Sequence, residues 1–458
     1  MVDHQLPRSA SAWAPLRWPL FRALWIASLT SSIGTWMHEV GAVWLMTSLT
    51  LSPVMVALMQ TAASLPIVVL ALPAGAIADV LDRRKVLLFT QAWMLASAAA
   101  LGVLAVLDAT TPWLLLILTF ALGAGAAMNA PAWQATTPEA VPRADLPAAV
   151  ALTGMSLNIA RAVGPAVGGA IVIATGVWAV FLLNAASFLA VMVVLYRWRR
   201  TTPRQQPAGK PLLGTIGEGI RYASKTPALR AVLVRSGLFV PFASALWALL
   251  PLLVRYEVKL NCYGYGTLFG CLGMGAVIGA ILLSKLRRHF STDTLVGGAT
   301  IMFAAATAAL AEVRHFGLLC LIMIVGGIAW ITLMASFNVA TQMAVPSWIR
   351  ARALALYLLV FHGGMAAGSA LWGAVTQHVG IEAALFGAAG GLIVSLIPMA
   401  RYPLKGSEQS ESSPSTYRRI APRSVVPAHL ADQRKCSRTT RQSDSNWSPA
   451  QMKSSHLK

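Results

Sequence analysis

The chain has 458 residues, of which 57% are hydrophobic and only 11% are charged, whereas a soluble protein carries about 25% charged residues. One water-soluble core cannot hide that much apolar surface, which excludes an ordinary soluble protein and predicts that the lipid bilayer is the solvent for much of the chain. The formal net charge of +20 does not indicate a nucleic-acid partner, because outside a basic tail after Arg401 it is spread over short clusters between apolar runs.

Twelve apolar runs follow a polar and basic segment, residues 1–19. A helix needs about 20 apolar residues to cross roughly 30 Å of hydrocarbon, and the need to pair every backbone polar group favours helices over open strands. The sequence therefore predicts an all-α membrane protein with twelve transmembrane helices. The runs lie near residues 20–47, 52–79, 86–107, 112–135, 149–175, 177–196, 229–254, 264–286, 294–312, 316–341, 352–377 and 381–400.

Basic residues are concentrated in every second connection between these runs. Lys and Arg are enriched in cytoplasmic loops, so the connections rich in them, together with both termini, are expected in the cytoplasm. The rich set holds Arg83, Arg84, Lys85, Arg143, eight basic residues within 197–230, Lys285, Arg287, Arg288, Arg350 and Arg352. The alternate set holds only Arg255, Lys259 and Arg314.

The longest internal polar stretch, residues 197–228, divides the runs into six and six. A shift of 204 residues supports this division, because it places Gly75, Arg83, Arg84, Pro142, Gly164, Gly169 and Gly176 on Gly279, Arg287, Arg288, Pro346, Gly368, Gly373 and Gly380. We therefore expect two six-helix bundles, at residues 20–196 and 229–401, joined by a cytoplasmic loop in which 214–225 forms an amphipathic helix. Residues 402–458 are rich in Ser, Arg, Gln and Pro and are expected to be a disordered cytoplasmic tail.

Two charges lie inside apolar runs. Glu39 is in the first run, about 12 Å from its outer end at 1.5 Å per residue, and Arg161 is near the middle of the fifth. A lone charge at the bilayer centre costs about 2.5–3.5 kcal/mol, so each should face a partner or water. A Glu39–Arg161 pair is feasible, either as a static ion pair or as a proton-coupling site.

Two stretches have a specific pattern. The first is Gly75-Ala-Ile-Ala-Asp79-Val-Leu-Asp82-Arg83-Arg84-Lys85, a compact charged turn between two apolar runs. The second is Arg161-Ala-Val-Gly164-Pro165-Ala-Val-Gly168-Gly169. Small residues four apart let helices approach closely, and Pro165 removes a backbone hydrogen bond and bends the helix. Taken alone, the two stretches indicate a solvated hinge and tight packing.

The first stretch resembles the loop between helices 2 and 3 of the major facilitator superfamily of transporters. Further phrases narrow the resemblance to the transmembrane secretion effector branch, which includes enterobactin-exporter-like proteins, over residues 20–400. These phrases are Ile33-Gly-Thr-Trp-Met, Asn129-Ala-Pro-Ala-Trp-Gln134, Leu157-Asn-Ile-Ala-Arg-Ala-Val-Gly-Pro165 and Arg350-Ala-Arg-Ala-Leu-Ala-Leu-Tyr357.

The resemblance implies a role for each stretch. In the superfamily the acid equivalent to Asp79 faces the positive N-terminus of helix 11, here near 347–352, and latches the cytoplasmic side shut. The latch would comprise Gly75, Asp79, Asp82, Arg83, Arg84 and Lys85. Asp82 stands where relatives often have a second Gly. The helix 5 motif Gly164, Pro165, Gly168 and Gly169 goes with exporters that run as antiporters. Helix 4 lacks the Arg that antiporters often carry there, which leaves Glu39 and Arg161 as the candidates for proton coupling.

The resemblance implies that helices 1, 4, 7 and 10 line the cavity, so polar and aromatic residues of these runs are candidate substrate contacts. Asn158 and His362, which the 204-residue shift places on each other, are further candidates. Each is also explained as an interhelical hydrogen bond or packing contact. The candidates are His38, Trp44, Asn129, Asn158, Trp247, Asn338 and His362.

We expect a monomeric exporter of a small siderophore- or drug-like molecule in the bacterial inner membrane, working by alternating access and coupled to protons. The alternatives are an importer or facilitator of the same fold, and a membrane sensor or scaffold that moves nothing. No phosphate-binding Gly-x-x-x-x-Gly-Lys-Ser/Thr loop, His-Glu-x-x-His motif, catalytic triad or paired cysteine spacing occurs. We therefore expect no enzyme activity, metal or cofactor.

Overall fold

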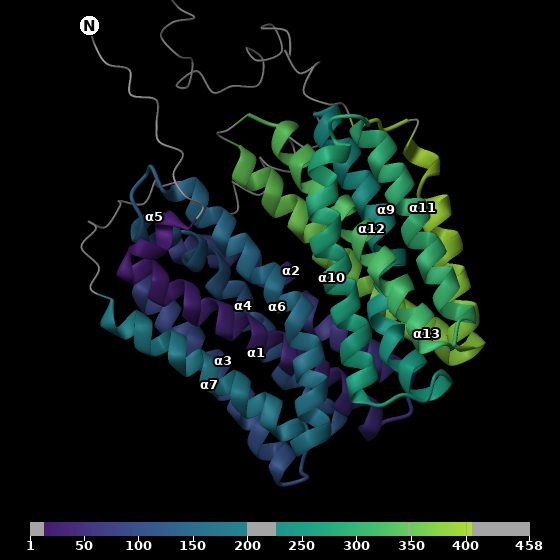
Figure 1. Cartoon of the computed structure of the whole chain (residues 1–458), viewed down its shortest axis with the longest axis horizontal. Helices are drawn as coiled ribbons and strands as arrows, with labels where there is room; N and C mark the ends of the chain where they lie inside the picture. Colours follow the sequence, from purple (N-terminus) through teal and green to yellow (C-terminus); the bar gives the residue numbers. More distant parts are fainter. Residues whose placement is uncertain (1–12, 199–225, 347–348, 400, 405–458) are drawn as a thin grey trace, which may run out of the picture. The chain divides into compact units, whose positions relative to one another are not determined.

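The computed structural model describes residues 13–198, 226–346, 349–399 and 401–404 (Figure 1). Within these ranges the side chains of residues 71, 72, 76, 78–80 and 351 are also left undescribed. The expected amphipathic helix at 214–225 and nearly all of the expected 402–458 tail therefore lie outside the described residues.

The described chain is helical, and no strand occurs in it. The long helices begin and end within a few residues of the predicted runs. A short helix, α5 (Thr137–Ala140), between the fourth and fifth long helices was not predicted. The long helices are α1 (Pro19–Leu49), α2 (Pro53–Val80), α3 (Arg83–Val106), α4 (Pro112–Gln134), α6 (Leu146–Thr175), α7 (Val177–Arg197), α9 (Pro227–Leu252), α10 (Cys262–Leu286), α11 (Thr292–Glu312), α12 (Phe316–Met343) and α13 (Arg350–Val394).

The last of these helices, α13, consists of two helical segments joined at a break. Gly380 inside α13 has φ 84°, a left-handed conformation that only glycine adopts without strain. Gly176, which separates α6 from α7, has φ 107°. The 204-residue shift relates these two glycines, so a glycine with a positive φ angle ends both the fifth and the eleventh long helical segment. Counting both arms of α13, the described residues form twelve long helical segments, and the number that cross the membrane stays a prediction.

Length and composition qualify ten helices of the described chain as membrane spans, with α13 counted once. Helix α1 is not among them, because it carries Glu39, His38 and several hydroxyl residues within its 31 residues. Its place in the bilayer therefore depends on the helices around it more than on its own apolarity.

The repeat is visible in the packing as well. We call α1–α7 the N-terminal bundle and α9–α13 the C-terminal bundle, coloured purple to teal and green to yellow in Figure 1. A Cβ built on Gly164 would lie 2.6 Å from Trp36 of α1, and one built on Gly368 would overlap Pro241 of α9. The two contacts join equivalent helices, α1 with α6 and α9 with the first arm of α13. Each remains inside its own bundle.

The next pair of equivalent glycines contacts the other bundle instead. A Cβ on Gly169 of α6 would lie 2.7 Å from the carbonyl oxygen of Cys262 in α10. A Cβ on Gly373 of α13 would lie 3.2 Å from the Cα of Val54 in α2. The two bundles therefore meet along α6–α10 and α2–α13, with Thr61 of α2 adding a hydrogen bond of 2.8 Å to the Ala366 carbonyl.

The apolar core is shared at one end and divided at the other. We call the end that carries the α2–α3, α10–α11 and α12–α13 connections the basic end, and the other the opposite end. One large core joins both bundles and takes its α1 and α2 members from the stretches nearer the opposite end, among them Met37, Val40, Met46, Val56 and Met59. At the basic end the N-terminal bundle has a core of its own, and the C-terminal bundle has a small separate cluster beside the large core, which there includes Val232, Val296 and Leu404. The first includes Phe21, Leu24, Val86 and Leu195, and the second is Leu229, Val345, Ile349 and Ala353.

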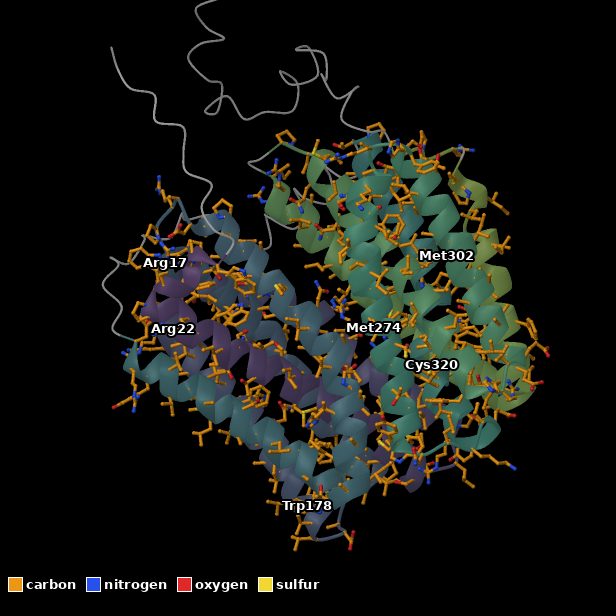
Figure 2. The ribbon with its side chains drawn as sticks, viewed as in Figure 1. Arg17, Arg22, Trp178, Met274, Met302 and Cys320 are labelled. Carbon is orange, nitrogen blue, oxygen red and sulfur yellow. The ribbon has the colours of Figure 1, made fainter. Side chains whose placement is uncertain are left out.

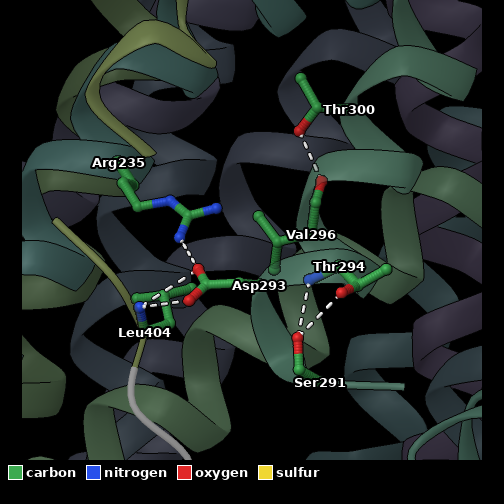
Figure 3. A network of polar contacts seen from close by, with 7 residues as sticks. All are labelled: Arg235, Ser291, Asp293, Thr294, Val296, Thr300 and Leu404. Atoms are coloured by element: carbon green, nitrogen blue, oxygen red, sulfur yellow. Dashed lines mark hydrogen bonds and ion pairs between the residues drawn. The ribbon is translucent and has the colours of Figure 1, made fainter. Parts of the chain in front are cut away.

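The end of the described chain is held by a buried ion pair in the C-terminal bundle (Figure 3). Arg235 of α9 is only 4% exposed and donates to Asp293, which lies in the first turn of α11. The same carboxylate accepts the backbone N–H of Leu404, 3.1 Å from each of its oxygens. A buried guanidinium without such a partner would be strongly destabilising. This contact fixes residues after α13 against α9 and α11.

Candidate functional site: the seam between the bundles

Helices α1, α6 and α10 meet at the seam between the two bundles. One face of α1 carries two aromatic contacts to α10: Trp36 lies 5.9 Å from Phe269, and Trp44 is stacked 6.2 Å from Tyr265, both between ring centroids. Glu39 lies between Trp36 and Trp44 on the same helix. The electrostatic interaction of Glu39 with Tyr265 of α10 places the carboxylate near the boundary with the other bundle.

The electrostatic partners of Glu39 come from both bundles. Its carboxylate attracts the guanidinium of Arg161 on α6, although no ion pair within 4 Å joins them among the described contacts. Arg161 also lies 5.6 Å above the ring of Trp36, a cation–π contact. The buried phenol of Tyr265 on α10 lies within the field of Glu39. A change of charge at Glu39 therefore acts on the N-terminal and the C-terminal bundle together.

The helix 5 motif packs into two interfaces at once. Gly164 and Gly168 face α1, where a Cβ on Gly168 would lie 2.8 Å from the Cα of Met37. Pro165 and Gly169 face α10, and a Cβ built on Gly266 would overlap the Pro165 carbonyl. The four residues thus let α6 touch both helices of the seam at backbone distance.

At the opposite end a group of cross-bundle contacts closes the seam. We call it the clasp: Trp44 and Thr47 of α1 with Arg255 and Tyr256, which lie in a π-helical turn after α9 (Leu253–Glu257). Arg255 donates to Thr47 Oγ1 at 3.1 Å and lies 5.1 Å above the Trp44 ring. The Tyr256 hydroxyl donates to the Thr47 carbonyl at 3.0 Å. π-Helical turns occur often at functional sites, because they re-aim side chains within a helix.

The residues expected to form a latch are found in contacts within the N-terminal bundle. Asp82 caps α3, its Oδ1 accepting the backbone N–H groups of Arg84 at 2.9 Å and Lys85 at 3.3 Å. Arg83 forms an ion pair of 2.7 Å with Glu139 of α5. The side chain of Lys85 is exposed.

The side chain of Arg84 caps the C-terminal end of α7. It donates to the carbonyl oxygens of Leu195 at 3.0 Å and of Tyr196, at the C-terminal turn where a cation is favoured. A Cβ on Gly75 would meet no atom within 4 Å. The side chain of Asp79 lies outside the described residues, as does the start of the predicted partner at 347–348, so the latch itself stays a prediction.

Two of the expected substrate contacts have their described contacts within the N-terminal bundle. His38 packs on Phe181 of α7, with 4.5 Å between ring centroids, and neither of its ring nitrogens has a hydrogen-bond partner among the described residues. Asn158 donates to the Gly154 carbonyl of its own helix at 3.1 Å.

The asparagines of α4 and α12 are engaged in hydrogen bonds. Asn129 accepts from Thr90 at 3.0 Å and from Gln91 at 3.4 Å, both on α3. Asn338 accepts from Gln342 of its own helix at 2.7 Å. These contacts fit the structural explanation of the two residues and leave their relation to a substrate as a prediction.

The C-terminal bundle has an aromatic cluster around Trp330. Trp247 lies 4.2 Å from Trp330 and Phe361 lies 5.9 Å from it, between ring centroids. His362 contacts Phe361 edge-on at 5.0 Å, and its Nδ1 is buried without a partner among the described residues. The structure thus brings Trp247 and His362 into one cluster, which sequence alone did not connect.

Sequence reasoning missed several residues that join the two bundles. Arg255 was used only to count charges, and Tyr256, Tyr265 and Thr47 were not singled out. One signal was available: Arg255 is one of three basic residues in connections that otherwise carry none. No group of three or more His, Cys, Asp or Glu residues able to hold a metal is found in the described chain.

Comparison with known proteins gives a consistent result. The family model described as transmembrane secretion effector matches residues 10–434. The chain is 26% identical over 381 residues to the multidrug efflux pump Tap of Mycolicibacterium fortuitum, covering 80% of this chain and 91% of the pump. It is also 26% identical over 362 residues to the enterobactin exporter EntS of Salmonella typhimurium, covering 78% of this chain and 85% of the exporter.

Solved structures share the fold at low identity. A point mutant of the nucleoside transporter NupG superimposes with a TM-score of 0.72 at 14% identity, covering 84% of this chain and 100% of that one. A bacterial homologue of the human lysosomal transporter Spinster has a TM-score of 0.64 at 14% identity, covering 85% and 95%. These matches confirm the predicted all-helical transporter fold.

Proposed function

Because the chain belongs to the transmembrane secretion effector family and is a multi-pass membrane transporter, we propose that it exports a small organic molecule from the cytoplasm in exchange for protons. Two relatives are named for export, one of multiple drugs and one of enterobactin. We place the protein in the bacterial inner membrane with its basic end in the cytoplasm, as the distribution of Lys and Arg favours.

The observation that carries the coupling is the position of Glu39 at the seam. A carboxylate there attracts Arg161 when charged and loses that attraction when it takes up a proton. Since α6 and α10 touch at backbone distance beside it, a change in the position of Arg161 is passed directly to the other bundle. The membrane potential supplies about 2.3 kcal/mol per charge per 100 mV to drive such a step.

The divided core supports access from the basic end. There each bundle buries its own apolar residues, so the bundles can separate without exposing a shared core. At the opposite end the core is continuous and the clasp holds α1 to the π-helical turn. In the proposed cycle the substrate enters at the basic end, the bundles close over it, and the clasp opens to release it outside.

The test is proton-linked transport in inverted membrane vesicles, with ethidium and enterobactin as separate probes. After respiration has acidified the vesicle lumen, adding a transported probe should release protons and restore the fluorescence of a pH-sensitive acridine dye. Glu39→Gln should abolish this release. Glu312→Gln, the same change at an exposed residue of α11, should leave it intact.

Two results would contradict the proposal in different ways. Proton release at the normal rate in Glu39→Gln would remove Glu39 from the coupling. Probe accumulation in right-side-out vesicles but not in inverted ones would show import instead of export. Neither outcome depends on the other, so coupling and direction are tested separately.

A further inference from the structure

Helices α10 and α12 of the C-terminal bundle cross at backbone distance. A Cβ built on Gly275 would overlap the carbonyl of Ile324, and one built on Gly279 would lie 2.9 Å from the Cα of Ile328. Both pairs differ by the same 49 positions, so the helices run parallel and in register. Glycine at these positions permits the approach.

One helical turn earlier, the same register pairs two cysteines. Cys271 of α10 precedes Gly275 by four residues, and Cys320 of α12 precedes Ile324 by four (Figure 2 labels Cys320). The Cys271 thiol lies within electrostatic reach of the Cys320 thiol. Both side chains are half-buried and neither forms a disulfide. The register and this electrostatic interaction therefore agree that the two thiols lie near each other at the crossing.

We propose that Cys271 and Cys320 form a two-sulfur binding site for a thiol-seeking trivalent arsenical. Thiolates are the preferred ligands of soft elements. A monosubstituted arsenical needs two sulfurs, which this site supplies, whereas structural zinc needs four ligands. The half-buried, apolar surroundings suit an uncharged organic arsenical that enters through the lipid.

The binding step is balanced without an oxidant. Hydrated phenylarsine oxide carries two hydroxyl groups on arsenic. Each hydroxyl leaves as water with the proton of one thiol, and two arsenic–sulfur bonds replace two arsenic–oxygen bonds. Arsenic stays trivalent throughout. Once the first bond has formed, the second thiol reacts intramolecularly, which raises the affinity by about 10²–10⁴ over a single thiol.

The experiment uses the full-length protein in detergent with one equivalent of phenylarsine oxide, followed by an excess of 2-mercaptoethanol as a competing monothiol. Intact mass should show one phenylarsenic group retained, and alkylation with N-ethylmaleimide should leave Cys271 and Cys320 unmodified. A dithiol, 2,3-dimercaptopropanol, should remove the group and restore alkylation. This pattern distinguishes a two-sulfur adduct from a single arsenic–sulfur bond.

Single-cysteine variants test which cysteines bind the arsenical. Cys271→Ser and Cys320→Ser should each lose retention by about 10²–10⁴-fold, the intramolecular advantage. Cys262→Ser is the matched control, since it removes a buried cysteine of the same helix, and it should retain the arsenical. Thermal unfolding of each variant shows that it is folded. Retention in Cys271→Ser, loss in a folded Cys262→Ser, or alkylation of both cysteines in the treated protein would overturn the assignment.

Discussion

The clasp makes a quantitative prediction about which end of the transporter is closed. Replacing Arg255 by Ala removes its hydrogen bond to Thr47 and its cation–π contact with Trp44, both of which join the two bundles. The variant should therefore populate a form open at the opposite end more than the unchanged chain does. The rest of the seam, including Tyr256, is left intact.

The magnitude follows from the two interactions that the substitution removes. A hydrogen bond to a charged group contributes about 1.5–3 kcal/mol, and a partly exposed cation–π interaction about 0.5–1 kcal/mol. Arg255 is half-buried and forms hydrogen bonds with water when the clasp opens, so we take about 2 kcal/mol as the difference between the closed and open forms. Since about 1.4 kcal/mol is tenfold, the ratio of open to closed protein should rise about 30-fold.

Distances between spin labels report this ratio directly. Labels at Ala109→Cys and His378→Cys, in a chain whose native cysteines are serine, place one probe on each bundle at exposed positions of the opposite end. Double electron–electron resonance in lipid nanodiscs should show a larger long-distance population in Arg255→Ala. Arg314→Ala is the matched control, because Arg314 lies at the same end but pairs with Glu382 of its own bundle. Unchanged distances in Arg255→Ala, or an equal change in Arg314→Ala, would refute the reasoning.

Two further predictions concern the helices themselves. Gly266→Val should overpack the α6–α10 crossing, destabilise the protein by about 1–3 kcal/mol and lengthen the same label distances. Gly154→Val is the control, because a Cβ there meets open space, and it should do neither. Equal behaviour of the two variants would contradict the close α6–α10 crossing. Asp82→Ala should destabilise the protein by about 0.5–2 kcal/mol through loss of the α3 cap, measured as thermal unfolding in detergent, while Asp82→Asn should retain most of the stability. A thermal midpoint of Asp82→Ala equal to that of the unchanged chain would show that the cap contributes nothing.

The fold was predictable because lipid imposes a simple rule on sequence. Every apolar run long enough to cross the bilayer became a helix, and the 204-residue shift identified Gly176 and Gly380, which share a left-handed backbone and a position between rods. Polar connections gave less information. The short helix α5 and the π-helical turn after α9 depend on tertiary contacts, so the hydrophobic periodicity of the sequence does not predict them.

The site was predictable only in part. An intramembrane charge is costly enough to attract notice, so Glu39 and Arg161 stood out. Their partner Tyr265 did not, because a tyrosine in an apolar helix has no unusual cost and its direction depends on how the bundles pack. For the basic triplet, the structure adds ion-pair and helix-capping contacts of Arg83 and Arg84 inside one bundle, which the sequence did not predict, and the latch stays a prediction.

The weak apolarity of α1 has a consequence for how the protein is made. Arg161 lies 122 residues after Glu39, so at about 5–20 residues per second the ribosome delivers the guanidinium roughly 6–24 s after the carboxylate. During that interval the first helix carries an uncompensated acid at a depth that lipid disfavours. We therefore expect that, until α6 is inserted, Glu39 is either protonated or held in a protein-lined site of the insertion machinery.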